Sequence, residues 1–161
     1  GGMSEMEVRK FREGDEKELW ELFYNTIHNI NIQDYDKAQV TAWAPDDLGI
    51  DFVVQKFREI DPFLVIQGGK IIGYADIQPD GYIDHFYCHH EFQGQGVGST
   101  LFATLEKKAR ENGVSKMYSN VSITARPFFE AMGFSVEKEQ VLQMGDQQLK
   151  NYRMVRGYGD S

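Results

Sequence analysis

Cysteine, positive charge and long apolar runs are all scarce in this chain of 161 residues. Cys88 is the single cysteine, so no disulfide can form within the chain and a reducing compartment is the default expectation. The net charge of −8 disfavours nucleic acid or an anionic membrane surface as the main partner. No apolar run approaches the roughly 18 residues of a membrane span, and no signal peptide is visible. We therefore expect a cytoplasmic protein with no nucleic-acid or membrane partner.

The length and composition are those of one small globular domain. Hydrophobic residues make up 41% of the chain, including 11 Phe and 8 Tyr, which is enough for a packed core. We expect the domain to span residues 3–157, followed by a frayed tail at 158–161. Gly1-Gly2 before Met3 is interpreted as a cloning remnant. The acidic balance mildly favours a cationic substrate such as an amine.

The richest local signal is a glycine-rich segment, Gln93–Ser99, which places Gly94, Gly96 and Gly98 at alternate positions. An apolar run precedes it and a helical pattern follows it. Glycine permits a sharp turn and a close approach to the main chain, and the first N–H groups of a helix have no partner inside the helix. The segment therefore predicts a strand, an anion-binding turn and a helix.

Two common phosphate loops do not fit the spacing. A nucleotide-type P-loop needs Lys and then Ser or Thr after its last glycine, whereas Val97-Gly98-Ser99 contains no Lys. In a dinucleotide fingerprint starting at Gly94, the third glycine would have to stand one residue beyond Gly98. A flexible surface turn is the alternative interpretation.

Periodicity and turn residues predict a mixed αβ order along the chain. The expected strands are Glu7–Phe11, Phe63–Gln67, Lys70–Gln78, Tyr82–His89, Val114–Val121, Phe134–Gln143 and Gln148–Val155. The expected helices are Glu16–Asn29 with Asp15 as its N-cap, Asp34–Trp43, Asp47–Ile60, Ser99–Asn112 and Ala125–Met132.

The pattern Gln93-x-x-Gly96-x-Gly98 resembles the acetyl-CoA pyrophosphate loop of the GCN5-related N-acetyltransferases (GNAT family). A second segment, Ala125–Phe134, is similar to the stretch of that family that ends in Tyr-Glu-x-x-Gly-Phe. Both landmarks occur in the right order within the expected αβ sequence. The resemblance implies an α+β fold of α/β/α layers. Its twisted, mixed and mostly antiparallel sheet would have about seven strands, with helices on both faces and strands four and five splayed apart.

The family resemblance also implies an activity, acetyl transfer from acetyl-CoA to a small-molecule or peptide amine by direct attack in a ternary complex. The pantetheine arm would pair with the backbone of Phe86 and Cys88, and an N–H near Cys88 would stabilise the oxyanion. No metal is expected. The residues expected to bind the cofactor are Phe86, Tyr87, Cys88, Gln93, Gly94, Gln95, Gly96, Val97, Gly98, Ser99, Ser122 and Phe129.

Asp84 is the first choice for the general base, because a carboxylate on a strand that should be buried is costly unless it has a partner or a function. The alternative is that Asp84 pairs with a nearby cation or amide and only shapes the site. His85 has a suitable ordinary pKa, but strand alternation would point it to the opposite face. We expect His85 to contact the substrate or to be a structural histidine.

The general acid is less well defined, because Phe129 stands where the family usually has a tyrosine. Tyr118 is our catalytic candidate for this role, and Tyr87, Cys88, Ser122 and water are alternatives. Cys88 as a nucleophile and a zinc site from His85, Cys88, His89 and His90 are sharper alternatives that adjacent strand positions and the lack of a second ligand cluster disfavour.

The N-terminal third is expected to build the acceptor pocket, with His28, Tyr35 and Trp43 as candidate lining residues. Core packing is the alternative for Tyr35 and Trp43. Two other functions stay open: transfer from a longer acyl-CoA, and a catalytically silent CoA-binding or sensing module, for which Phe129 is the motive. Because this family often dimerises, a homodimer is one further expectation.

Overall fold

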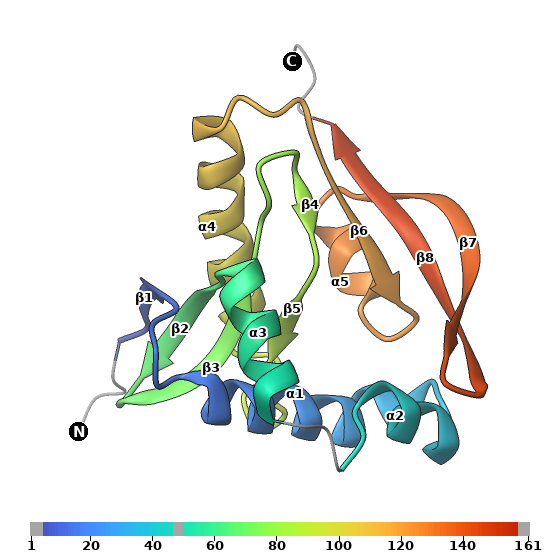
Figure 1. Ribbon diagram of the computed structural model, residues 1–161. Coiled ribbons are helices and arrows are strands. Elements are labelled where there is room, and N and C mark those ends of the chain that lie inside the picture. The colour runs from blue at the N-terminus through green and yellow to red at the C-terminus, as the bar shows by residue number, and fades with distance from the viewer. Residues whose placement is uncertain (1–4, 47–49, 158–161) are drawn as a thin grey trace.

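The computed structural model describes residues 5–46 and 50–157, and it has the α+β order that the sequence predicts (Figure 1). The strands are β1 (Glu7–Lys10), β2 (Phe63–Gln67), β3 (Lys70–Ala75), β4 (Tyr82–Ile83), β5 (Phe86–Cys88), β6 (Lys116–Ser122), β7 (Ser135–Met144) and β8 (Gln147–Gly157). The helices are α1 (Glu16–Asn29), the short 3-10 helix η1 (Asn31–Gln33), α2 (Lys37–Trp43), α3 (Ile50–Ile60), α4 (Val97–Glu111) and α5 (Arg126–Ala131).

The strands form two four-stranded sheets, in the orders β1-β2-β3-β5 and β4-β6-β8-β7. All pairings are antiparallel except that of β4 with β6. The expected mixed and mostly antiparallel architecture is therefore confirmed. The strand count differs, because the expected strand Tyr82–His89 is broken into β4 and β5 and so adds an eighth strand.

A buried carboxylate accounts for this break. Asp76 is fully buried, and its Oδ1 accepts the N–H of Asp84 at 3.0 Å and the N–H of His85 at 2.6 Å. Gln78 Nε2 donates to Asp76 Oδ2 at 2.7 Å. A side chain thus takes main-chain hydrogen bonds that a continuous strand would give to its neighbours. We had placed Asp76 inside a strand extending to Gln78, whereas β3 ends at Ala75.

The break parts the two sheets. β4 pairs with β6 through Tyr82–Tyr118 and Ile83–Ser119, but beyond this point the described pairings of β5 are with β3. The chain therefore leaves one sheet and joins the other within two residues. The splaying of the expected strands four and five is confirmed, and the wedge between β5 and β6 is open for a ligand.

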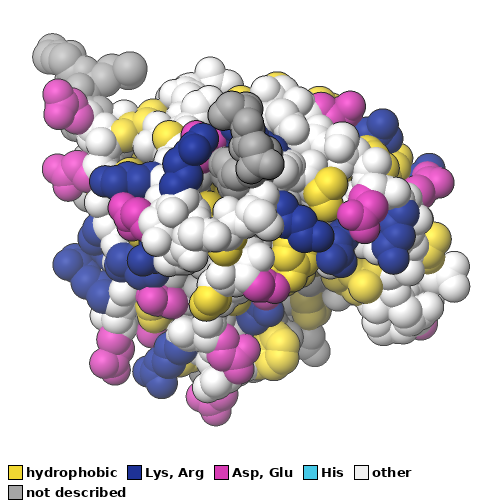
Figure 2. Space-filling view, turned by 90° about the horizontal axis from the view of Figure 1, so that it is seen from above, with side chains coloured by type: hydrophobic (Ala, Val, Ile, Leu, Met, Phe, Trp, Pro, Cys, Tyr) yellow, Lys and Arg dark blue, Asp and Glu magenta, His cyan; other side chains and the backbone are white. Residues whose placement is uncertain are grey.

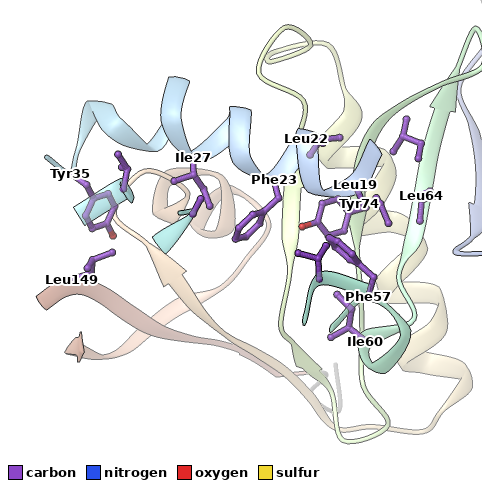
Figure 3. Close-up of a cluster of buried hydrophobic side chains, with 14 residues drawn as sticks. Leu19, Leu22, Phe23, Ile27, Tyr35, Phe57, Ile60, Leu64, Tyr74 and Leu149 are labelled. Atoms are coloured by element: carbon purple, nitrogen blue, oxygen red, sulfur yellow. The ribbon is translucent and has the colours of Figure 1, made fainter. Parts of the chain in front are cut away.

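Helix α1 spans the two sheets on one face. Its apolar side chains Leu19, Leu22, Phe23 and Ile27 are buried, as the helical pattern predicted. Figure 3 shows these side chains in a row, with Tyr74 and Phe57 near one end and Tyr35 and Leu149 near the other. Since Tyr74 belongs to β3 and Leu149 to β8, this cluster ties the two sheets together.

Asp15 is the N-cap residue of α1, as the sequence predicts, but its side chain makes no capping hydrogen bond to the helix. Its carboxylate instead accepts the Arg9 guanidinium at 2.8 and 2.9 Å and the N–H of Arg12 at 2.9 Å. A bidentate ion pair to β1 is the stronger interaction, and it fixes the entry of the helix.

Helices α4 and α5 cover the other face of the parted sheets. Leu101, Phe102, Leu105 and Ala109 of α4 are buried in a second cluster, together with Phe129 of α5. The two sheets are therefore packed on opposite faces by two apolar clusters. The wedge between β5 and β6 lies between these clusters.

The segment before the long hairpin differs from the prediction. The expected helix Asp34–Trp43 begins three residues later, as α2 (Lys37–Trp43), because Asp36 and Gln39 form a reciprocal capping box at its start, and η1 precedes the expected range. For the expected helix Asp47–Ile60, residues 47–49 lie outside the described residues and α3 covers Ile50–Ile60. The tail 158–161 also lies outside them.

The tip of the β7–β8 hairpin lies beside α2 (Figure 1). Gln39 Nε2 donates to the carbonyl of Gln148 at 2.8 Å, and the Tyr35 hydroxyl donates to the carbonyl of Lys150 at 2.5 Å. The N–H of Ile123 donates to the same hydroxyl at 3.0 Å. These bonds close the N-terminal helices against the C-terminal hairpin.

Acidic and basic side chains are interspersed over the face shown in Figure 2. That face therefore carries no continuous patch of one sign, despite the net charge of −8. Within residues 5–46 and 50–157, no helix has both the length and the apolar character that a bilayer span requires.

Replacing Asp76 with Ala should lower the free energy of unfolding by about 3 kcal/mol, because two buried N–H groups lose their acceptor. Asp76→Asn should cost less, because its Oδ1 still accepts and the Gln78 amide can reverse. Urea unfolding at pH 7 measures both. Equal losses for the two variants would contradict this account of the strand break.

A comparison of wild type with Asp76→Asn tests the ionisation of Asp76. Burial raises the pKa of Asp76 from 3.8 to about 6, so the folded state binds this proton more tightly than the unfolded state. This contribution to stability is complete below pH 4 and is lost as the pH rises through 6. From pH 7 to pH 5, wild type should gain about 1 kcal/mol relative to Asp76→Asn. A parallel pH response of the two proteins would refute the shift.

Candidate active site

The glycine-rich loop has the geometry of an anion site. Gly94 and Gly96 have φ of +73° and +87°, and a Cβ built on either would meet nothing within 4 Å. Gly96 is the N-cap of α4, and no side chain caps the helix. The N–H groups of 97–99 therefore have no partner within α4 and remain available to a ligand.

Gln93, the first residue of the motif, hydrogen-bonds the loop to the end of β5. Its Nε2 donates to the carbonyls of Cys88 at 3.0 Å and His89 at 3.3 Å. Thr26 Oγ1 of α1 donates to the same Cys88 carbonyl at 2.9 Å. The loop is thus fastened to the end of β5, so that its free N–H groups face the same space as the strand edge.

A first cavity of about 420 Å³ follows the wedge between β5 and β6 to this loop. Eleven of the twelve residues expected to bind the cofactor line it, and the exception is Gln95. Those that line it are Phe86, Tyr87, Cys88, Gln93, Gly94, Gly96, Val97, Gly98, Ser99, Ser122 and Phe129.

The edge of β5 presents main-chain groups to this cavity. The N–H of Asp76 donates to the His85 carbonyl at 3.1 Å, and the N–H of His89 donates to the Ile72 carbonyl at 2.9 Å. Since hydrogen bonding alternates along an antiparallel ladder, the main-chain groups of Phe86 and the N–H of Cys88 point away from β3, into the wedge, while the Cys88 carbonyl is taken by Gln93 and Thr26. An extended ligand can pair with them as an added strand would.

A second cavity, of about 280 Å³, lies between α1, α2, the strand break and the β7–β8 hairpin. It shares part of its wall with the first cavity, through Trp43, Asp84, Tyr87, Asn120 and Ser122. A group bound in one cavity can therefore meet a group bound in the other at this common wall.

Asp84 is the one carboxylate among the described residues that line either cavity, and it lines both. Its Oδ2 lies 2.6 Å from Nζ of Lys56 on α3, with 26% of the Asp84 side chain exposed. A partly exposed acid at the common wall suits proton transfer, while the ion pair is the structural alternative that we raised from the sequence.

His85 lines the second cavity together with Asp84, which contradicts the opposite faces predicted from alternation. The reason is the break at this point, since Asp76 takes both main-chain N–H groups. The imidazole stacks on Phe23 at 5.5 Å, and its Nδ1 lies 3.0 Å from the Tyr74 hydroxyl. Burial lowers the pKa of His85 to about 4, so the ring is neutral near pH 7.

The structure places Tyr118 outside both cavities. It lies where β4 and β6 are still paired, and its hydroxyl donates to the Asp80 carboxylate. Phe129 lines the first cavity but is buried among Phe86, Phe128 and Phe134. Neither of these side chains brings a proton to the common wall.

Ser122 and Tyr87 are the hydroxyl groups at the common wall. Ser122 Oγ accepts the N–H of Ala125 at 3.0 Å and Nδ2 of Asn31 at 3.3 Å. A hydroxyl has two lone pairs and one proton, so both acceptor sites are used and the proton remains to be donated. Burial raises the pKa of Tyr87, so that phenol stays protonated.

Of the three residues expected to line the acceptor pocket, Tyr35 and Trp43 line the second cavity, and their rings meet edge to face at 5.5 Å. Because the Tyr35 hydroxyl both donates and accepts within the protein, the side chain offers its ring to a ligand. His28 lines neither cavity. It stacks on Tyr24 at 4.1 Å, and its Nε2 lies 2.8 Å from the Ala44 carbonyl.

The structure bears on two alternatives, Cys88 as a nucleophile and a zinc site. Burial raises the pKa of Cys88 to about 12, so its thiol is protonated at neutral pH and is a weak nucleophile. The zinc set of His85, Cys88, His89 and His90, which the sequence already disfavours, does not come together among the described residues. Among the described residues, the group close enough to share an ion is His89, His90 and Glu91, without His85 or Cys88.

The polar residues at or beside the site that sequence reasoning missed include Asp76, Lys56, Asn120 and Asn151. An acid inside the apolar run Ile71–Ile77 was the available signal for Asp76. Asn120 and Asn151 lie on β6 and β8, where exposed strand positions carry polar residues as a rule, so nothing local distinguished them. Lys56 is joined to Asp84 only by tertiary structure.

Comparisons with known proteins agree with this geometry. A family model described as "Acetyltransferase (GNAT) domain" matches residues 31–153. The uncharacterized N-acetyltransferase YafP of Escherichia coli (strain K12) is 28% identical over 152 residues, which cover 94% of this chain and 96% of the relative.

Solved structures share the fold along nearly the whole chain. A crystal structure from Rhodopseudomonas palustris, described as "GCN5-Related N-acetyltransferase: Aminotransferase, Class-II", has a TM-score of 0.90 and 25% identity, with 98% of both chains covered. YncA of Salmonella typhimurium, solved with its cofactor acetyl-CoA, has a TM-score of 0.70 and 16% identity, with 98% of this chain and 96% of that chain covered.

Acidification should lower the free energy of unfolding through His85. The pKa of His85 is lowered from 6.5 to about 4 in the folded state, so its contribution to stability is present above pH 6.5 and is lost as the pH falls through 4. Between pH 7 and pH 5, wild type should lose about 2 kcal/mol of unfolding free energy through this group. His85→Phe keeps the stack on Phe23 and should lack this loss in urea unfolding. An unchanged acid response in the variant would argue against a neutral, buried imidazole.

Proposed function

Because this chain belongs to the GNAT acetyltransferase family, we propose that it moves an acetyl group from acetyl-CoA to a primary amine by direct attack in a ternary complex. The enzyme is an acyltransferase. The observation that carries the proposal is the common wall, where two cavities on either side of a parted sheet meet at Asp84.

The first cavity has groups suited to each part of coenzyme A. The free N–H groups of 97–99 and the positive end of the α4 dipole suit the pyrophosphate. The open space above Gly94 and Gly96 leaves room for phosphates against the main chain. The inward-facing N–H and carbonyl of Phe86 suit the amides of the pantetheine arm, and the N–H of Cys88 is left for the thioester. Acetyl-CoA supplies the thioester that is attacked.

Asp84 is the proposed general base. An amine attacks only as a neutral molecule, so a proton must leave the incoming ammonium near the common wall. Asp84 accepts it directly or through a water molecule. The N–H of Cys88 donates to the carbonyl oxygen as negative charge develops there, which lowers the barrier to attack.

Ser122 is the proposed donor to the leaving sulfur, in place of the tyrosine that the family resemblance leads one to expect at Phe129. Its lone pairs are both used, so its O–H is directed to another acceptor. A thiolate needs only a stabilising hydrogen bond at this step, since it can then take a proton from solvent. Tyr118, which lies outside both cavities, is not needed in this scheme.

Gly96→Val should weaken acetyl-CoA binding, measured by calorimetry, by at least about tenfold. A β-branched side chain at a φ of +87° is strained and would occupy the space proposed for the phosphates. Gly113→Val, at another positive φ beyond the end of α4, is the matched control and should bind normally if folded. Equal weakening in both variants would mean that the loop has no special place in cofactor binding.

Asp84→Asn should lower kcat about 100-fold or more at saturating acetyl-CoA, with little change in cofactor affinity, because the base is lost and the shape is kept. Lys56→Met removes the ion pair and keeps the carboxylate, so it should reduce kcat less than tenfold. Thiol release measures both. If the two variants lose the same activity, Asp84 acts through its ion pair and is not the base.

Ser122→Ala should lower kcat about tenfold while the acetyl-CoA dissociation constant stays unchanged, because the donor acts on the leaving group. Tyr118→Phe serves as the comparison and should retain activity. The reverse ranking of these two variants would return the donor role to Tyr118. Tight coenzyme A binding without thiol release for any amine or acyl-CoA would instead favour the sensing module.

A further inference from the structure

The second cavity combines a few polar side chains with a mostly aromatic and aliphatic lining. The polar residues are Asp84, His85, Asn120, Ser122 and Asn151, and three of them, Asp84, Asn120 and Ser122, belong to the common wall. The other lining residues are five aromatic and three aliphatic or thioether side chains, from Phe23, Tyr35, Trp43, Tyr82, Tyr87, Leu142, Met144 and Leu149. A ligand with one polar head and an apolar body suits this lining.

Asn151 supplies an unused acceptor near the common wall. Its Oδ1 is buried and has no hydrogen-bond partner in the protein. Asn151 on β8 stands directly opposite Ser122 on β6, and side chains in such a pair share one face of the sheet. A buried polar atom without a partner is costly, so a ligand donor is the natural partner for this oxygen.

The charged residues of the second cavity disfavour a ligand that carries a carboxylate. Among the described residues that line the second cavity, none is Lys or Arg, and Asp84 is the one acid. A ligand carboxylate would therefore be desolvated without a cation, close to a carboxylate of the protein. The nearby Nζ of Lys56 is already engaged by Asp84 at 2.6 Å.

The size and the mouth of the cavity favour a small ligand. Its volume of about 280 Å³ lies just below the usual range for small-molecule sites, which begins at about 300 Å³. Leu142, which lines it, is 42% exposed, so an apolar side chain lies where the cavity is open to solvent.

We propose that the acceptor is a small primary amine with an aromatic or alkyl body and no carboxylate, held at its nitrogen by Asp84 and by Oδ1 of Asn151. This inference rests on the proposed acetyl transfer and names its substrate class. The ammonium donates to both oxygens, and the aromatic rings cover the body. Free amino acids are excluded by their carboxylates.

Matched pairs of amines test the proposal. With the full chain and saturating acetyl-CoA, thiol release is measured for 2-phenylethylamine against phenylalanine and for hexylamine against 6-aminohexanoate. Phenylalanine methyl ester controls for bulk beside the nitrogen. Each amine should exceed its acid by at least about 30-fold in kcat/KM, and the ester should exceed phenylalanine. Acids that react as well as their amines would overturn the inference.

Two variants probe the wall directly. Met144→Arg adds a cation to the cavity and should narrow the gap between amine and acid by at least about tenfold, whereas Gln143→Arg, on the other face of β7, should not. Asn151→Leu should raise the KM for 2-phenylethylamine and leave acetyl-CoA affinity unchanged. An unaltered KM would remove Asn151 from amine binding.

The outcome separates this inference from the function on which it rests. Spermidine and a short peptide with a free N-terminus complete the panel, and acetyl-CoA binding is measured independently by calorimetry. Turnover of these acceptors without turnover of the apolar amines would overturn the substrate class and keep the acetyltransferase. Failure to bind acetyl-CoA would overturn both.

Discussion

The carboxylate of Asp76 is the interaction on which the rest of the site depends. By accepting the N–H groups of Asp84 and His85, it ends the pairing with β6 and allows the chain to continue beside β3. A continuous ladder would have closed the wedge and hidden the main-chain edge of Phe86 and Cys88. One buried side chain thus converts a sheet into two sheets with a reaction space between them.

In the proposed scheme, the two cavities would recognise their ligands by different means. The cofactor side offers main-chain groups, namely the loop N–H groups and the edge of β5, whereas the acceptor side offers rings and a few polar side chains. Within the described part of the chain, neither lining contains Lys or Arg. Anion binding by main-chain dipoles is the means by which, under this proposal, an acidic protein would hold a phosphate group without lysine or arginine in the cavity.

Sequence reasoning succeeded where the determinants are local. The apolar face of Glu16–Asn29 predicts α1 residue for residue, and the alternating glycines predict the turn before α4. The family resemblance carried the splayed strands. Sequence reasoning failed where a residue distant in sequence determines the local structure. Asp76 imposes the break after Ile83, and the position of His85 follows from that break. Asn151 meets Ser122 only because β8 pairs with β6.

Tyr35, together with Gln39 of α2, joins the N-terminal helices to the β7–β8 hairpin through its main chain. They donate to the carbonyls of Lys150 and Gln148, so these two hydrogen bonds do not depend on the identity of the hairpin side chains. Leu142, Met144 and Leu149 of this hairpin line the second cavity and not the first, and Leu149 is also held in the core beside Tyr35. In the proposed scheme, substitutions at Leu142 and Met144 would therefore change the acceptor that fits and leave the acyl donor the same.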